Sequence, residues 1–117
     1  MKPEPYVGMT TPWGVAQTVE QLAEGIFFVS TPSHGGAWVS QEWREFMPGV
    51  LKRPTNFYQG GPWFEEDCEI LRVVVAFPRA FPQMERAKAI EMLSQIHPEM
   101  SEAIRLAVQA RPWGGSP

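Results

Sequence analysis

Two short stretches of the chain hold the residues best suited to chemistry. The first is Ser33-His34-Gly35-Gly36, in which an imidazole stands beside two glycines. The second is Glu65-Glu66-Asp67-Cys68, which joins three acids to the only cysteine. A thiol beside an imidazole can act as a nucleophile–base pair, and imidazole, thiolate and carboxylate all bind zinc. If the fold joined the two stretches, either kind of site could form.

Both stretches also have a structural interpretation. Glycine tolerates left-handed or closely approached backbone, so Gly35 and Gly36 are typical of a turn. Cys68 is predicted on an apolar helix face, where a free cysteine is usually a small buried hydrophobic residue. The sequence contains no CxxC, no HExxH and no Gly-rich phosphate loop. We therefore predict no catalytic residue, no metal ligand and no cofactor. A hydrolase or metal protein that uses Cys68 and His34 stays open as the alternative.

Aromatic residues beside the acidic stretch indicate a binding role. Phe57, Tyr58 and Trp63 lie in or just after a connection over residues 50–62 that is rich in Gly and Pro. Long connections are often functional, and Trp and Tyr are enriched at the energetic centres of protein interfaces. The predicted binding residues are Phe57, Tyr58, Trp63, Glu65, Glu66 and Asp67. The predicted structural motif is Ser33, His34, Gly35, Gly36 and Cys68.

The acidic stretch is predicted to open a core helix over residues 63–77. Phe64, Cys68, Leu71 and Val75 are spaced by four, three and four residues, which places them on one helical face. The acids would then lie in the first turn, where the helix dipole favours negative charge. Because Val73–Val75 are β-branched, residues 70–77 also fit a buried strand.

We expect the two stretches to meet in the folded protein. A helix start has unpaired backbone N–H groups, and acids beside it need hydrogen-bond donors of their own. His34 and the backbone of Gly35-Gly36 could supply those donors. We therefore predict that His34 lies within hydrogen-bonding reach of Glu65, Glu66 or Asp67, with Cys68 buried beneath the contact.

The other elements predict an α+β fold in which a small antiparallel three-stranded meander packs against about four helices. The strands are expected within 13–22, 25–31 and 37–39, and Ser40 is a good N-cap for a helix over 41–47. Further helices are expected from Pro82 to about Ile96 and from Pro98 onward, with His97 as a cap. The predicted organisation is an extended segment 1–12, a single domain 13–112 and a short tail 113–117.

Composition narrows the functional classes. The chain has 117 residues, a formal charge of −3 and one cysteine, which suits a single domain in a reducing cytoplasm. No apolar stretch approaches the roughly 20 residues of a membrane span. The acidic balance argues against direct nucleic-acid binding. Such binding would need a basic cluster formed by Lys52, Arg53, Arg44, Arg72 and Arg79.

Four stretches, in the same order, resemble an uncharacterised family of short proteins from phages, plasmids and other mobile elements of bacteria. They are Thr11–Gly14, Glu24–Ile26, Ser30–Gly36 and Trp63–Cys68. The resemblance covers most of residues 11–80, and it implies an α+β fold and a mobile-element setting but no activity.

Small acidic proteins of mobile elements often inhibit host machinery, and anti-CRISPR and other anti-defence proteins are examples. We therefore expect a non-enzymatic protein, in the cytoplasm of a bacterial host, that binds a host protein. An anti-defence inhibitor is the specific form of this expectation, with a nucleic-acid-binding defence complex as its candidate partner.

Overall fold

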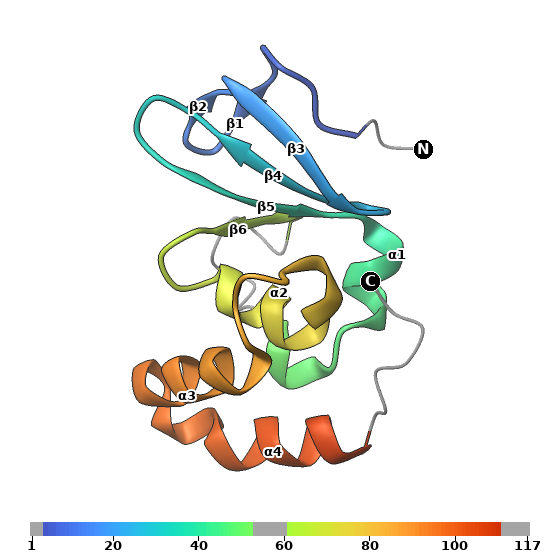
Figure 1. Ribbon diagram of the computed structural model, residues 1–117, viewed down its shortest axis with the longest axis vertical. Coiled ribbons are helices and arrows are strands. Elements are labelled where there is room, and N and C mark those ends of the chain that lie inside the picture. The colour runs from blue at the N-terminus through green and yellow to red at the C-terminus, as the bar shows by residue number, and fades with distance from the viewer. Residues whose placement is uncertain (1–3, 53–60, 111–117) are drawn as a thin grey trace.

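The computed structural model describes residues 4–52 and 61–110, which form a mixed α+β fold. A four-stranded antiparallel sheet carries helices on one face and the N-terminal segment on the other (Figure 1). The strands are β1 Thr10–Thr11, β2 Gly14–Val15, β3 Thr18–Ala23, β4 Ile26–Ser30, β5 Gly35–Val39 and β6 Trp63–Glu65. The helices are α1 Gln41–Phe46, α2 Ile70–Ala76, α3 Arg86–Ile96 and α4 Ser101–Ala110, with 3-10 turns η1 Gly49–Leu51, η3 Pro78–Ala80 and η4 Pro98–Met100.

The expected α+β class is confirmed, but the expected three-stranded meander is one strand too small. β3, β4 and β5 are consecutive antiparallel neighbours, and β6 joins the far side of β5. Ala37 pairs with Phe64, and Trp38 pairs with Trp63. The sequence prediction missed β6 because it gave residues 63–65 to the central helix. A three-residue strand is too short to show a two-residue alternation.

Residues 70–76 are the helix α2 and not the alternative strand. The helix starts at Ile70, however, so the acids lie at the end of β6 and in the turn after it, and not in the first turn of the helix. Phe64 lies in β6, and its side chain is buried in the core. It pairs with Ala37 of β5. The spacing of Phe64 from Leu71 therefore matched a helix by coincidence. Every residue of α2 after Ile70 is buried, so no polar face marks where it begins.

The remaining helices follow the sequence in outline. Ser40 caps α1, because its side-chain oxygen accepts a hydrogen bond from the Trp43 N–H at 3.3 Å. The helix expected from Pro82 begins only at Arg86, and Pro98 opens the 3-10 turn η4 before α4. His97 is the C-cap of α3, as expected. None of the helices within the described residues is long and apolar enough to cross a membrane.

The main core lies between the sheet and the helices. Ile26, Val39 and Phe64 face the helical layer from three strands, and Leu71 and Phe77 meet them from the region of α2. All of these side chains are almost fully buried. Burial of large apolar side chains in one continuous cluster is the dominant stabilising term in a domain of this size.

One cation is embedded beside this core. The Arg72 guanidinium donates hydrogen bonds to the carbonyl oxygens of Val50 and Lys52, at 3.3 and 3.2 Å. Burial lowers the pKa of Arg72, while Glu69 and Glu99 oppose that shift. Arginine keeps its charge in proteins. Arg72 therefore ties η1 and the residue after it to α2.

The opposite face of the sheet is covered by a smaller cluster. Phe27, Val29 and Trp38 project from β4 and β5 toward the N-terminal segment, where Ala16 is buried against them. Gln17 N–H donates to the Ser30 carbonyl at 2.8 Å and fixes the segment at the sheet. The predicted extended segment, residues 1–12, includes β1, which pairs with β2 as a two-stranded ribbon. The predicted tail 113–117 lies outside the described residues.

Candidate functional site

The two chemically distinctive stretches of the sequence meet at one corner of the sheet. Gly36 pairs with Glu65 across the β5–β6 ladder, and the Glu66 N–H donates to the Gly35 carbonyl at 3.0 Å. The expectation that the stretches meet is therefore confirmed. The cause differs from the expected one, because strand pairing joins them and the start of a helix does not.

The hydrogen bond predicted between His34 and an acid is not formed within the described residues, but His34 lies near two of the three acids at this corner. One donor atom each from His34, Glu65 and Asp67 lies within 4.8 Å of the other two. His34 and Asp67 are exposed, and Glu65 is half-buried. The imidazole comes from the loop before β5, while the carboxylates come from the end of β6 and the turn after it. An imidazole and two carboxylates thus converge from two separate segments.

A tight turn holds the backbone of His34. The Thr31 hydroxyl donates to the His34 carbonyl at 2.7 Å, and the Thr31 N–H donates to the same carbonyl at 2.8 Å. The His34 N–H donates in turn to the Thr31 hydroxyl oxygen at 3.2 Å. Ser33 adds a hydrogen bond from its hydroxyl to the Trp13 carbonyl at 3.2 Å. The position of His34 is therefore set by the fold of its own loop.

Gly36 is required for close packing. A Cβ atom at this position would lie 2.3 Å from the Phe64 carbonyl oxygen and 2.5 Å from Cη2 of Trp13. The described glycines with positive φ are Gly8, Gly14 and Gly25, so Gly35 and Gly36 are needed for space and not for a left-handed backbone. The Trp13 indole rests in the space that the missing side chain leaves.

The acids share this corner with two tryptophans. The rings of Trp13 and Trp63 meet edge to face, with centroids 5.5 Å apart. Both side chains are half-buried. Within the described residues, no cation forms an ion pair with Glu65, Glu66 or Asp67. The predicted binding residues Phe57 and Tyr58 lie outside the described part of the chain.

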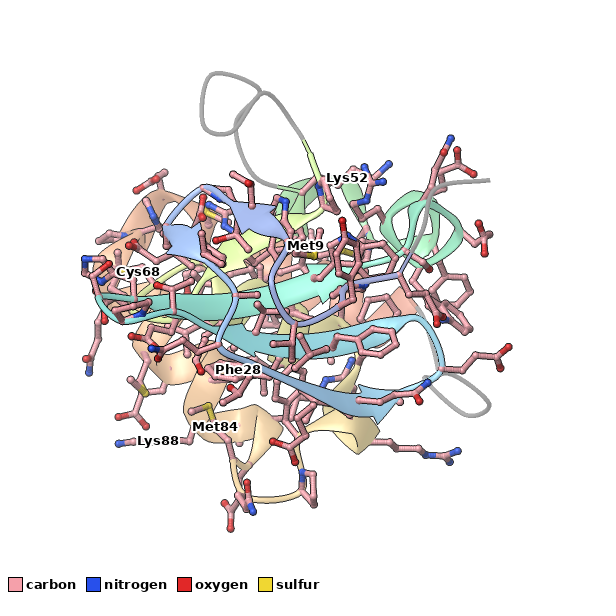
Figure 2. The ribbon with its side chains drawn as sticks, turned by 90° about the horizontal axis from the view of Figure 1, so that it is seen from above. Met9, Phe28, Lys52, Cys68, Met84 and Lys88 are labelled. Carbon is pink, nitrogen blue, oxygen red and sulfur yellow. The ribbon has the colours of Figure 1, made fainter. Side chains whose placement is uncertain are left out.

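Cys68 contradicts its predicted position. It is exposed, not buried beneath the His34 contact, and Figure 2 shows it at the rim of the molecule. The error follows from the helix start, because Cys68 lies in the turn between β6 and α2 and not on an apolar helix face. The converging donor set consists of His34, Glu65 and Asp67, so the acids and not the thiol accompany the imidazole.

Nucleic-acid binding was expected to need a basic cluster of five cations, and the described members of that set do not all contribute to one. Arg72 is buried and its guanidinium is bonded to backbone carbonyls, so it cannot contribute to an exposed basic cluster. The Arg44 guanidinium donates to the Val39 carbonyl at 3.0 Å, and burial lowers its pKa although Glu45 opposes the shift. Arg53 lies outside the described residues.

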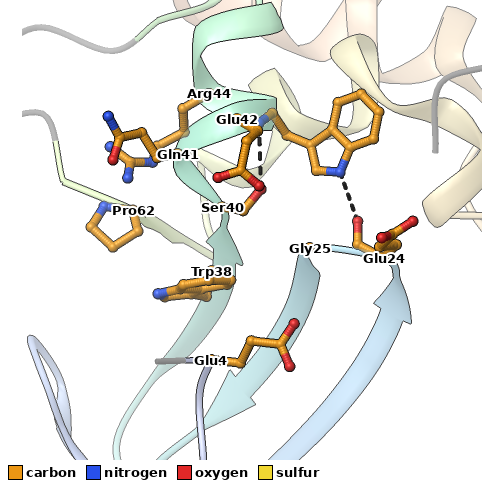
Figure 3. Close-up of a pocket in the computed structure, with 10 residues that line it drawn as sticks. Glu4, Glu24, Gly25, Trp38, Ser40, Gln41, Glu42, Arg44 and Pro62 are labelled. Atoms are coloured by element: carbon orange, nitrogen blue, oxygen red, sulfur yellow. Dashed lines mark hydrogen bonds between the residues drawn. The ribbon is translucent and has the colours of Figure 1, made fainter. Parts of the chain in front are cut away.

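A cleft of about 710 Å³ opens at the other end of β5, and the sequence analysis did not predict it. Figure 3 shows the Trp38 indole between Glu4 on one side and Gln41, Arg44 and Pro62 on the other. The acids that line the cleft are Glu4, Glu24 and Glu42. They are too far apart in the sequence to form a recognisable pattern.

The wall of this cleft depends on one glycine. Gly25 has φ of +78°, and a Cβ there would lie 2.7 Å from Cδ1 of Trp43. The Trp43 indole N–H donates to the Glu24 carbonyl at 2.8 Å. The turn between β3 and β4 is thereby fastened to α1.

Comparison with known proteins yields a family but no function. Residues 6–114 match the model of a domain of unknown function, DUF7007. No curated protein and no solved structure matches the chain. The matched range spans the whole described fold except for its first two residues, and it includes both stretches that meet at the sheet corner. The chain therefore belongs to the DUF7007 family of domains of unknown function.

Proposed function

We propose that this protein acts without catalysis, by binding a partner protein through the surface at the corner of β6. We call this the β6 surface and define it by its residues: Trp13, Trp63, Glu65, Glu66 and Asp67. The observation that carries the proposal is the pairing of half-buried indoles with acids that have no ion-pair partner within the described residues. Indoles supply binding energy at protein interfaces, and charges that the fold leaves uncompensated supply orientation.

The chemistry of the β6 surface favours a basic partner. Its three acids are part of a chain whose total formal charge is −3. Acidic surfaces associate quickly with basic ones, and the attraction weakens as salt is added. Proteins that bind nucleic acids have basic surfaces of this kind. A protein of this charge could therefore compete for the basic channel of a nucleic-acid-binding complex.

We further propose that the setting is a mobile element in a bacterial host and that the partner belongs to a host defence system. The resemblance of four stretches to short phage and plasmid proteins supports this setting. An anti-CRISPR or other anti-defence inhibitor would be the specific form. A hydrolase that uses Cys68 and His34 has less support, because the residues that converge on the imidazole are the two carboxylates.

The proposal can be tested with two variants of equal charge. The surface variant carries Glu65→Gln, Glu66→Gln and Asp67→Asn. The control variant carries Glu91→Gln, Glu99→Gln and Glu102→Gln, which removes three acids from exposed positions in the helical layer. Wild type and both variants are immobilised, bacterial host lysate is passed over each, and the retained proteins are identified by mass spectrometry.

We expect the wild type and the control variant to retain the same basic protein, and the surface variant to lose it. Expression of each form in a host challenged with phage or plasmid then tests the anti-defence role. Equal retention by the surface variant would contradict the proposal. So would turnover of a hydrolase substrate that disappears in a Cys68→Ser variant.

A further inference from the structure

We propose that His34, Glu65 and Asp67 form a binding site for a divalent transition-metal ion, with Zn²⁺ as the ion of best fit. The sequence alone paired His34 with Cys68, whereas the fold brings one carboxylate oxygen each from Glu65 and Asp67 within 4.8 Å of an imidazole nitrogen. The site would be a property of the isolated chain. It does not depend on the partner proposed above.

The spacing of the donor atoms supports this inference. The three atoms lie within 4.8 Å of one another. Zinc holds nitrogen and oxygen ligands at about 2.0–2.2 Å, so the ligands of a tetrahedral ion are about 3.3–3.6 Å apart. Rotation of the exposed His34 and Asp67 side chains can close the difference.

The types of donor favour a transition metal over calcium or magnesium. Calcium and magnesium prefer sites built from oxygen alone. Imidazole suits zinc, copper, nickel and iron, and carboxylates complete many of their sites. The described part of the chain places one imidazole nitrogen and two carboxylate oxygens here, and it offers no other such group. Three protein ligands would leave one tetrahedral position open to water or to another donor.

The scaffold beneath the three donors is rigid at both of its ends. The Thr31 turn fixes the His34 backbone through the hydrogen bonds described above. Glu66 lies between Glu65 and Asp67 in the sequence, and its N–H donates a hydrogen bond to the Gly35 carbonyl. The Glu65 N–H also donates to the Glu69 carboxylate at 3.0 Å, which fastens the turn after β6. A site held in this way loses little backbone freedom on binding an ion.

The chain contains its own control for this inference. The only other histidine, His97, has Nδ1 at 3.3 Å from Oε2 of Glu99. That pair resembles one edge of the proposed site but has no third donor in the described structure. A nonspecific histidine–acid interaction with metal would therefore involve both histidines. The proposed site would involve His34 alone.

The test measures Zn²⁺ binding to the purified protein by competition with a chromogenic chelator. Calcium and magnesium are titrated separately by calorimetry. We expect one Zn²⁺ per chain, and at least about tenfold weaker binding in each of His34→Ala, Glu65→Gln and Asp67→Asn, as losses in metal sites typically are. His97→Ala, Glu66→Gln and Cys68→Ser should bind Zn²⁺ as the wild type does. In a proton NMR spectrum, Zn²⁺ should move the ring signals of His34 and leave those of His97 in place.

Three results would overturn the site. They are no saturable Zn²⁺ binding, equal losses in the His34→Ala and His97→Ala variants, and loss of binding in Cys68→Ser. Thermal unfolding of each metal-free variant shows whether it folds, and the exposed Asp67→Asn change serves if His34→Ala does not. Because the assay contains only protein and metal, its failure would leave the partner proposal untouched.

Discussion

The two faces of the sheet are built on different principles. The helical face is closed by aliphatic and aromatic side chains that are almost fully buried, from Ile26 on β4 to Ile104 on α4. The N-terminal face is covered by a few aromatic side chains. At Gly36 the missing side chain leaves room for the Trp13 indole. Trp63 and Glu65 project toward this second face, because they flank the inward-facing Phe64. The difference indicates that the helical face carries most of the stability and the N-terminal face carries the candidate site.

The largest expected effect is the loss of stability when a large side chain is removed from the main core, compared with the same change in the smaller cluster. Phe77 is fully buried in the helical layer and its ring lies 5.6 Å from that of Trp43. Phe77→Ala should lower the free energy of unfolding by about 3–5 kcal/mol. Phe27, on the other face, is slightly exposed and meets Trp38 at 5.8 Å. Phe27→Ala should lower the free energy of unfolding by less, because its apolar cluster is smaller.

Denaturant unfolding of both alanine variants measures this contrast. If Phe27→Ala proved more destabilising than Phe77→Ala, the N-terminal face would be the main source of stability, and the division proposed here would be wrong.

The second prediction concerns the close packing at Gly36. Gly36→Ala would place a methyl group 2.3 Å from the Phe64 carbonyl oxygen, so β6 or Trp13 must move. Overpacking of this kind typically costs about 1–3 kcal/mol. Gly49 is the matched control, because a Cβ there meets nothing within 4 Å. Thermal unfolding should show a lower Tm for Gly36→Ala and little change for Gly49→Ala. Equal Tm values would show that the close approach is unimportant.

A smaller effect is expected where the sheet passes into the helical layer. Ser40→Ala removes the side-chain acceptor of the Trp43 N–H and should destabilise the protein by about 1 kcal/mol. Ser40→Asp retains an acceptor and should keep most of the stability. Chemical denaturation compares the three proteins. If alanine and aspartate had the same effect, the cap would not be the cause.

The smallest effect lies on the exposed surface of the helical layer. The hydrogen bond from Arg105 lowers the pKa of Glu102 below its ordinary value of 4.5. A carboxyl group with a lowered pKa in the folded state stabilises the fold above its unfolded pKa, and this contribution is lost as the pH falls through the folded pKa. The Tm difference between wild type and Glu102→Gln should therefore be small at pH 7 and should shrink toward pH 3. A difference that grew on acidification would contradict this sign.

Local signals allowed the sequence to predict part of the fold. Ser40 and the strand β4 were identified correctly because both signals are local: a capping side chain, and an aromatic and β-branched run bounded by Gly25 and Pro32. The helix α2 was recognised, but its start was not, since its buried residues show no polar face from which to judge it. Three further errors followed from the misplaced helix start. The strand β6 was missed, the acids were placed in a helix, and Cys68 was expected to be buried.

The candidate site was predicted in its parts but not in its arrangement. The pairing of Gly36 with Glu65 depends on strand register, which three residues of β6 cannot specify from sequence. The cleft beside Trp38 depends on Glu4, Glu24 and Glu42, and only the tertiary structure brings these residues together. Long-range geometry therefore decided which acids accompany His34.

The most direct test of the account is the affinity of the captured partner for the two charge-matched variants, measured by calorimetry with purified proteins. The surface variant at Glu65, Glu66 and Asp67 should bind at least about tenfold more weakly than wild type, a loss of roughly 1.4 kcal/mol or more. The control variant at Glu91, Glu99 and Glu102 should bind as wild type does. Both variants should unfold at nearly the wild-type temperature, because all six acids lie at the surface or its edge. Equal affinities for the two variants would contradict the claim that the β6 surface is the binding site.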